Sequence, residues 1–392
     1  MSGTVVPTTP HEFVGIPVVS IRGSAFERGV QYGEQVSEQI HRSQAAYEKV
    51  YSHFARWDWS QVREVAATFI DPIQQFDSRY LNEMRGIAVG SGLDFLDVLA
   101  MNLRTEILFA AKARQTGAIL PQVAECTTFA DTIGSSGRVL GQNWDWMVFA
   151  QDTIVLIEAV PEHGPRWMTV VEAGLLAKFG MNSAGIAVTT NALVTSADIG
   201  TPGVPYHVML RALLDCTSLV EMRSTLERAE RSSSANYMLA GDGEVVNAET
   251  RPGGADDITW TASYPHQVLL HTNHFSETRP LPSGLTDVGI TVMPDTVFRL
   301  ERAHTIAHAE GAEATQDIEW WKQLLSDHAG FPDSLCCHPN PGLDEIDQGV
   351  TVASVIFEPT KRRAHLAIGT PCTSKWLLLD YTAFFEWTFA LL

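Results

Sequence analysis

The spacing of apolar residues divides the chain into a helical first part and a strand-rich second part. Between residues 24 and 114, apolar side chains recur every three or four positions, as at Ile40, Tyr47, Val50, Tyr51 and Phe54. This period is typical of amphipathic helices. Similar series follow at 62–73 and 80–87, and Asp94 is the predicted N-cap of a further helix that ends near Lys112.

Beyond residue 125, short apolar runs separated by turn residues predict strands at 126–131, 139–144, 153–160, 167–172, 185–190, 237–240, 267–271, 352–357 and 364–368. Helical patterns return at 206–215, 218–231, 295–308 and 318–326. The helices are grouped between sets of strands and do not alternate with single strands. This order favours an α+β fold with antiparallel sheets over a doubly wound parallel fold. The segment 115–125, with Gly117 and Pro121, is predicted to be a linker.

Composition and charge narrow the class of protein. The chain has 392 residues, of which 45% are hydrophobic, which is typical of a globular protein with a large core. It carries 27 Lys and Arg against 46 Asp and Glu, a net charge of −19. Such an acidic chain is disfavoured as a partner of nucleic acids or anionic membranes.

The sequence contains no run of 18 apolar residues, and residues 1–10 lack the apolar core of a signal peptide. Its five cysteines are an odd number and are scattered, with Cys336 and Cys337 adjacent, so a disulfide framework is not expected. We therefore expect reduced thiols and a cytoplasmic location.

Several polar residues fall at the ends of predicted strands. Cys126 opens one strand, and Asp145 lies in the next strand after a tight turn, where a hairpin would bring the two together. Asn191 and Asn273 end two other strands. Such a group is a candidate active site, but a cysteine in a strand is also typical of an ordinary core residue. The residues alone leave both interpretations open.

Five segments, in order along residues 20–370, carry a resemblance to a known family. They are, from the N-terminal side, Arg28 to Gly33; Glu83 to Ala88 with Asn102 to Glu106; Cys126-Thr127-Thr128 with Gly141-Gln142-Asn143-Trp144-Asp145; Gly180 to Gly185 continuing to Asn191; and His271 to Phe275. Together they resemble the acyl-coenzyme A:6-aminopenicillanic acid acyltransferase family of N-terminal-nucleophile hydrolases, which is related to bile salt hydrolases.

The resemblance implies a four-layer αββα sandwich and synthesis as one precursor that cleaves itself before Cys126. The products would be a helical chain, 1–125, and a catalytic chain, 126–392, of 392 − 125 = 267 residues, which stay associated as a heterodimer. The implied substrate is a small N-acyl amide, with a coenzyme A thioester as a further acyl donor. No nucleotide cofactor is expected, because phosphate-binding glycine loops are absent.

A cysteine that begins a chain carries both a thiol and an α-amino group, and the amine can act as general base. By resemblance, Asp145 would hold this amine, and Asn273 would donate to the oxyanion with help from Asn191. Arg299 is matched to a supporting arginine, although an arginine on an amphipathic helix is usually solvated.

The chain departs from its relatives at two positions. Gln142 stands where bile salt hydrolases carry an arginine, and Glu125 stands where a glycine precedes the cysteine of the penicillin-producing relative. The way in which bile salt hydrolases hold the nucleophile is therefore not carried over whole. The charged residue before the scissile bond also leaves the rate of self-cleavage open.

A metal site is not expected from the sequence. His271 with His274 and His304 with His308 have suggestive spacings, but no glutamate completes the motif and no thiols are suitably spaced. The run Cys336-Cys337-His338 is interpreted as a loop bounded by Pro332 and Pro339.

Two other functions are open from the sequence. An unprocessed papain-like cysteine peptidase would pair Cys126 with one of the thirteen histidines, but its cysteine should begin a helix and not a strand. A binding protein that had lost catalysis would keep the fold without turnover.

Overall fold

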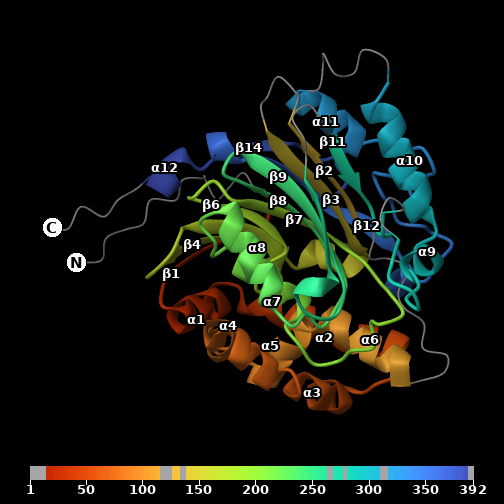
Figure 1. Ribbon diagram of the computed structural model, residues 1–392. Helices are drawn as coiled ribbons and strands as arrows, with labels where there is room; N and C mark the ends of the chain where they lie inside the picture. The colour runs from red at the N-terminus through yellow and green to blue at the C-terminus, as the bar shows by residue number, and fades with distance from the viewer. Residues whose placement is uncertain are drawn as a thin grey trace.

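Two β-sheets lie face to face between helical layers in this computed structural model (Figure 1). The structure describes residues 15–114, 126–132, 138–262, 268–276, 280–309 and 317–386. The predicted linker at 115–125 and residue Glu125 lie outside these ranges. Within them, the four-layer αββα arrangement expected from the sequence is confirmed.

The first sheet has eight strands, in the order β1 (Val18–Gly23), β4 (Ile154–Pro161), β5 (Trp167–Glu172), β6 (Phe179–Asn182), β7 (Ala187–Ala192), β8 (Ala235–Gly241), β9 (Glu244–Thr250) and β10 (Ile258–Ala262). All neighbours are antiparallel except β1 and β4. The first part of the chain thus contributes an edge strand as well as helices.

The second sheet has six antiparallel strands, in the order β11 (Val268–His271), β2 (Cys126–Asp131), β3 (Val139–Met147), β12 (Gly349–Glu358), β13 (Arg363–Ile368) and β14 (Leu377–Asp380). Every residue of β2 and β3 is buried. These central strands face β7 and β8 of the other sheet, so their inner side chains form the core between the sheets.

Helices cover both outer faces (Figure 1). The eight-stranded sheet carries α1 (Ala25–Gln35), α2 (Ser37–Val50), α3 (Trp59–Ala67), α4 (Ile70–Ser91), α5 (Phe95–Asn102), α6 (Arg104–Arg114), α7 (Tyr206–Leu213) and α8 (Leu219–Glu227) on its side of the molecule. The six-stranded sheet carries α9 (Gly289–Val292), α10 (Asp295–Ala307) and α11 (Ile318–Leu325), and α12 (Thr382–Glu386) follows the last strand. No helix among the described residues is long and apolar enough to cross a bilayer.

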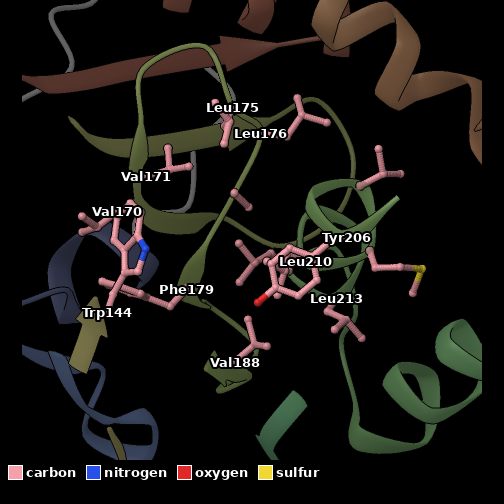
Figure 2. Packing of buried hydrophobic residues seen from close by; sticks show 14 of the residues in the cluster. Trp144, Val170, Val171, Leu175, Leu176, Phe179, Val188, Tyr206, Leu210 and Leu213 are labelled. Carbon is pink, nitrogen blue, oxygen red and sulfur yellow. The ribbon is translucent and has the colours of Figure 1, made fainter. Parts of the chain in front are cut away.

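Large side chains fill the space between the layers (Figure 2). The ring of Trp144 on β3 meets the edge of Phe179 on β6, with ring centroids 6.0 Å apart. Tyr206 and Leu210 of α7 belong to the same buried cluster as Trp144 and Phe179 (Figure 2). Trp144 therefore joins the two sheets directly beside the strand that begins at Cys126.

Two stretches of the family resemblance, residues 28–33 in α1 and 83–88 in α4, form one helix pair. A Cβ atom on Gly29 of α1 would lie 2.1 Å from the carbonyl oxygen of Glu83 in α4, and one on Gly86 would lie 2.2 Å from that of Phe26. Only glycine allows so close an approach. Buried Arg28 donates to Glu83 at 2.7 Å, so these segments hold the helices together away from the chemistry.

Candidate active site

Cys126 is the first residue of β2 and pairs with Trp144 of β3. Paired residues of an antiparallel ladder point to the same face, so the thiol lies with Trp144 between the sheets. Cys126 is buried and lines a pocket whose apolar wall is formed by Leu108, Phe109, Trp146, Val194, Val292 and Met293.

The backbone nitrogen of Cys126 is held by Asn273, which follows β11. The Cys126 N–H donates to Asn273 Oδ1 at 2.8 Å, and Asn273 Nδ2 donates to the carbonyl oxygen of Ala192 at 3.0 Å. The carboxamide therefore joins the start of β2 to the end of β7. A cleaved chain would carry its α-amino group at this nitrogen.

The carbonyl oxygen of Cys126 is held from two sides. It accepts from Asn191 Nδ2 at 2.9 Å and from Arg299 Nη1 at 3.1 Å. Asn191 Nδ2 also donates to the carbonyl oxygen of His271 at 3.4 Å, while its Oδ1 accepts from Thr128 at 2.7 Å. Both amide protons of Asn191 are thus engaged by backbone carbonyls.

Arg299 lies on α10 and is fully buried, so the solvated position considered from the sequence is wrong. Its guanidinium also donates to Thr127 Oγ1 at 3.2 Å and to Asn273 Oδ1 at 3.0 Å, and it forms an ion pair with Asp295. The planar fork of an arginine can bond several acceptors in fixed directions. These bonds hold both Cys126 and Asn273 in position.

Asp145 lies one residue beyond the Cys126–Trp144 pair and lines the same pocket. Its Oδ1 accepts from Thr351 Oγ1 at 2.5 Å, and its buried Oδ2 has no hydrogen-bond partner among the described residues. Burial raises the pKa of Asp145 to about 7, although the nearby Arg299 charge and the Thr351 hydrogen bond lower it. This carboxyl group can therefore exchange a proton near neutral pH.

Lys178, just before β6, is a pocket residue that the sequence analysis missed. It is buried, and its Nζ donates to Tyr206 Oη at 3.2 Å. Burial lowers the pKa of Lys178 to about 8. Burial also raises the pKa of the Cys126 thiol, and the Lys178 charge acts in the opposite direction. A single lysine within the apolar run Leu175-Leu176-Ala177-Lys178-Phe179 was the available signal.

Gln142 links the two sheets and does not line the pocket. Its Oε1 accepts from the backbone N–H of Thr190 on β7 at 2.9 Å. The structure therefore brings together five of the predicted site residues: Cys126, Asp145, Asn191, Asn273 and Arg299. Gln142 lies outside this group, between β3 and β7.

Three comparisons with known proteins bear on this site. The sequence profile of the family described as "Acyl-coenzyme A:6-aminopenicillanic acid acyl-transferase" matches residues 132–372. This range includes Asp145, Asn191, Asn273 and Arg299, and it begins after Cys126.

A 40 kDa form of acyl-coenzyme A:6-aminopenicillanic-acid-acyltransferase from Emericella nidulans is 24% identical over 356 residues, which cover 90% of this chain and 92% of that protein. Among solved structures, a conjugated bile acid hydrolase variant from Clostridium perfringens is 12% identical with a TM-score of 0.45, covering 65% of this chain and 92% of the other. An N-acylethanolamine-hydrolyzing acid amidase orthologue from Caenorhabditis elegans is 14% identical with a TM-score of 0.43, covering 60% and 93%. The family match spans more than half of the chain, and the protein therefore belongs to the acyl-coenzyme A:6-aminopenicillanic acid acyl-transferase family.

Proposed function

We propose that this protein is a self-processing amide hydrolase or N-acyltransferase that carries its acyl group on Cys126. The observation that supports this most directly is the hydrogen bond from the Cys126 nitrogen to Asn273 Oδ1. It places a side-chain acceptor where a free α-amino group would need to be oriented. The pocket beside the thiol supplies room for a substrate.

In the proposed processing step, the Cys126 sulfur attacks the carbonyl carbon of residue 125. The carbon–nitrogen bond breaks, the Cys126 nitrogen takes a proton and becomes the α-amine, and water then hydrolyses the thioester. Asp145 lies one residue beyond the ladder pair and has a pKa of about 7. It is therefore suited to supply the proton that the leaving nitrogen needs.

In turnover, the α-amine takes the thiol proton and the sulfur attacks the acyl carbonyl of the substrate. The amine product leaves with a proton, and water or a second amine then attacks the thioester. Asn273 would donate to the oxyanion, a contribution typically worth about 3 to 4 kcal/mol of barrier. Asn191 acts as a positioning residue, since its amide protons hold two backbone carbonyls.

The test is intact-mass spectrometry of the purified protein before and after incubation with a chromogenic N-acyl amide. We expect two fragments of 125 and 267 residues, which follow from cleavage before Cys126. Only the longer fragment should gain the mass of the acyl group. An acyl adduct on any other residue, or full activity in an uncleaved chain, would refute the proposal.

Hydrolysis is favoured over transfer because water is always present, whereas a transferase must exclude it. Supplying an acyl-coenzyme A thioester together with an amine separates the two. Free acid as the main product indicates a hydrolase, and an N-acyl amine indicates a transferase.

The apolar pocket wall favours an apolar acyl group. Leu108 of α6 forms part of this wall, so Leu108→Trp should fill space used by long acyl chains. Losing contact with two methylenes costs about 1.6 kcal/mol, and kcat/KM for long-chain substrates should fall about 15-fold. Short-chain substrates should keep their rate. Val220→Trp, at a position 71% exposed on α8, is the matched control; equal loss for all chain lengths would contradict the pocket assignment.

Lys178 should set the pH dependence of the nucleophile. Its charge lowers the pKa of the Cys126 thiol, so Lys178→Met should raise that pKa and shift the acidic limb of the kcat/KM profile to higher pH. A merely structural role would lower the rate at every pH without moving the limb. Lys178→Arg, which keeps the charge, should restore the position of the limb.

A further inference from the structure

Four side chains of types that bind metal ions lie close together outside the active-site pocket. They are His328, Cys336 and His338, from the connection between α11 and β12, and Cys372, from the connection between β13 and β14. Their ligand atoms all lie within 4.8 Å of one another. Cys372 is 34 residues from His338, which is why no local motif revealed the group.

Ordinary hydrogen bonding does not account for this arrangement. His338 Nε2 lies 3.1 Å from His328 Nε2, 3.4 Å from Cys336 Sγ and 3.5 Å from Cys372 Sγ. An imidazole nitrogen carries either one proton or one lone pair, so it can make one hydrogen bond and not three. A cation at the centre of the group would satisfy all four ligand atoms at once.

The three distances from His338 Nε2 also agree with tetrahedral coordination. With Zn–N bonds of about 2.1 Å and Zn–S bonds of about 2.3 Å, a tetrahedron separates two nitrogens by about 3.4 Å and a nitrogen from a sulfur by about 3.6 Å. Each distance from His338 Nε2 is within a few tenths of an ångström of these values. Two thiolates and two imidazoles in this geometry select zinc over magnesium or calcium, which prefer oxygen ligands.

We propose that this protein binds one Zn²⁺ ion through His328, Cys336, His338 and Cys372. Four protein ligands close the coordination shell, so the ion has a structural role and no open position for substrate. It joins the loop after α11 to the β13–β14 connection. The exposed side chain of His328 gives the ion a path of entry from solvent.

The ligand loop is already shaped by other contacts. The Cys336 N–H donates to the carbonyl oxygen of Asp327 at 3.0 Å, and the His338 N–H donates to that of Pro332 at 3.0 Å. Arg302 of α10 forms an ion pair with the Asp327 carboxylate at 2.6 Å. The two backbone bonds fix the direction in which Cys336 and His338 leave the main chain, and the partly exposed Arg302–Asp327 pair adds little to them.

The same loop reaches the active site. Cys337, between two of the ligands, donates its N–H to Thr351 Oγ1 at 2.9 Å, and Thr351 donates to Asp145 Oδ1 at 2.5 Å. The zinc ion therefore holds the segment that orients Asp145. Its loss should weaken the protein and, through Thr351, disturb the proton exchange assigned to Asp145.

The test is elemental analysis of protein produced with zinc in the medium and purified without a metal column, in the Cys126→Ala background so that the catalytic thiol takes no part. We expect one zinc per chain. Cys336→Ser and Cys372→Ser should each weaken zinc binding by more than about 100-fold, the upper end of effects from residues that only surround a metal site. Cys337→Ser removes a neighbouring thiol outside the cluster and should retain the metal.

A second measurement tests the site without changing any ligand residue, in case the ligand variants fail to fold. The Cys126→Ala protein is stripped with a chelator and titrated with Co²⁺, which should produce the visible bands of a tetrahedral, thiolate-bound ion. Zinc, and not magnesium, should restore the thermal midpoint lost on stripping. A protein without zinc, equal zinc in Cys336→Ser and Cys337→Ser, or an intact mass that reveals a Cys336–Cys372 disulfide would overturn the proposal.

Discussion

Cys126→Ala is expected to lower kcat for N-acyl amides by at least about 10⁴-fold, the scale seen when a nucleophile is removed from a catalytic group that acts as a unit. Asp145, Asn191 and Arg299, which lie around the thiol, orient or polarise and do not form the acyl bond, so they do not replace it. The same variant should remain one uncleaved chain. Steady-state kinetics and intact-mass spectrometry of the same preparation measure both effects.

The control for this prediction is another buried cysteine. Cys216 lies after α7, where its sulfur contacts the carbonyl oxygen of Ala212 and the Thr225 hydroxyl at 3.5 Å. Cys216→Ala should cleave normally and keep its activity. A Cys126→Ala chain that still separates into two fragments would show that processing does not use this thiol, and retained turnover would favour a nucleophile elsewhere.

Several inner strands were predictable because turn residues separate short runs that begin with apolar or β-branched side chains. Strands β2, β3, β5 and β13 lie where the sequence predicts them. The edge strand β1 was missed because its partner β4 lies more than 130 residues away, from Val18 to Leu156. The short strand β6 has only four residues, which is too few for a period to be read.

Strands β9, β10 and β14 were missed as well. Strand β10 is only partly buried, although its sequence Ile258-Thr259-Trp260-Thr261-Ala262 alternates apolar and polar residues and follows the turn residues Pro252-Gly253-Gly254, so this strand was readable from the sequence. The β propensity of a residue is a weak guide at the edge of a sheet, because fewer side chains pack against an edge strand. The places of β9, β10 and β14 in their sheets depend on pairing with β8, β9 and β13 respectively, which the local sequence does not encode.

The candidate site residues were predicted mainly from the order of the segments that resemble the family. The helical spacing of buried residues gives a further signal that the sequence also contains. The buried residues of α10 are Thr296, Arg299, Ala303 and Ala307, spaced three or four apart. Arg299 therefore lies on the inner stripe of this helix, whereas its neighbour Phe298 is 44% exposed. Small residues on that stripe leave room for a guanidinium, which is a readable signal for a buried arginine.

Arg299→Met is expected to destabilise the uncleaved chain by about 3–5 kcal/mol, the usual cost of removing one partner of a buried ion pair. It leaves Asp295 without its partner and removes donors from the Cys126 carbonyl and from Asn273 Oδ1. Urea unfolding in the Cys126→Ala background measures this free energy without interference from cleavage. Arg302→Met, on the same helix and with a partly exposed ion pair, should cost only about 0–1 kcal/mol.

Adding Asp295→Asn to Arg299→Met separates two roles of Arg299, which are to neutralise Asp295 and to hold Cys126 in position. If much of the cost is the unpaired carboxylate, the double variant should be more stable than the sum of the two single changes predicts. When the double variant is made in the chain that keeps Cys126, its activity should stay low, because the Cys126 carbonyl has still lost its donor, Arg299. Full recovery of both stability and turnover would show that Arg299 only balances Asp295.

The pH profile gives an independent measure of the same contact. The Arg299 charge lowers the pKa of Asp145, which burial has raised to about 7. Removing that charge must raise this pKa further, so Asp145 in Arg299→Met should keep its proton to higher pH. Any limb of the rate profile that requires ionised Asp145 should move in the alkaline direction, whereas Arg302→Met should leave it in place. A limb that stays fixed in Arg299→Met would mean that Asp145 does not control the proton in the rate-limiting step.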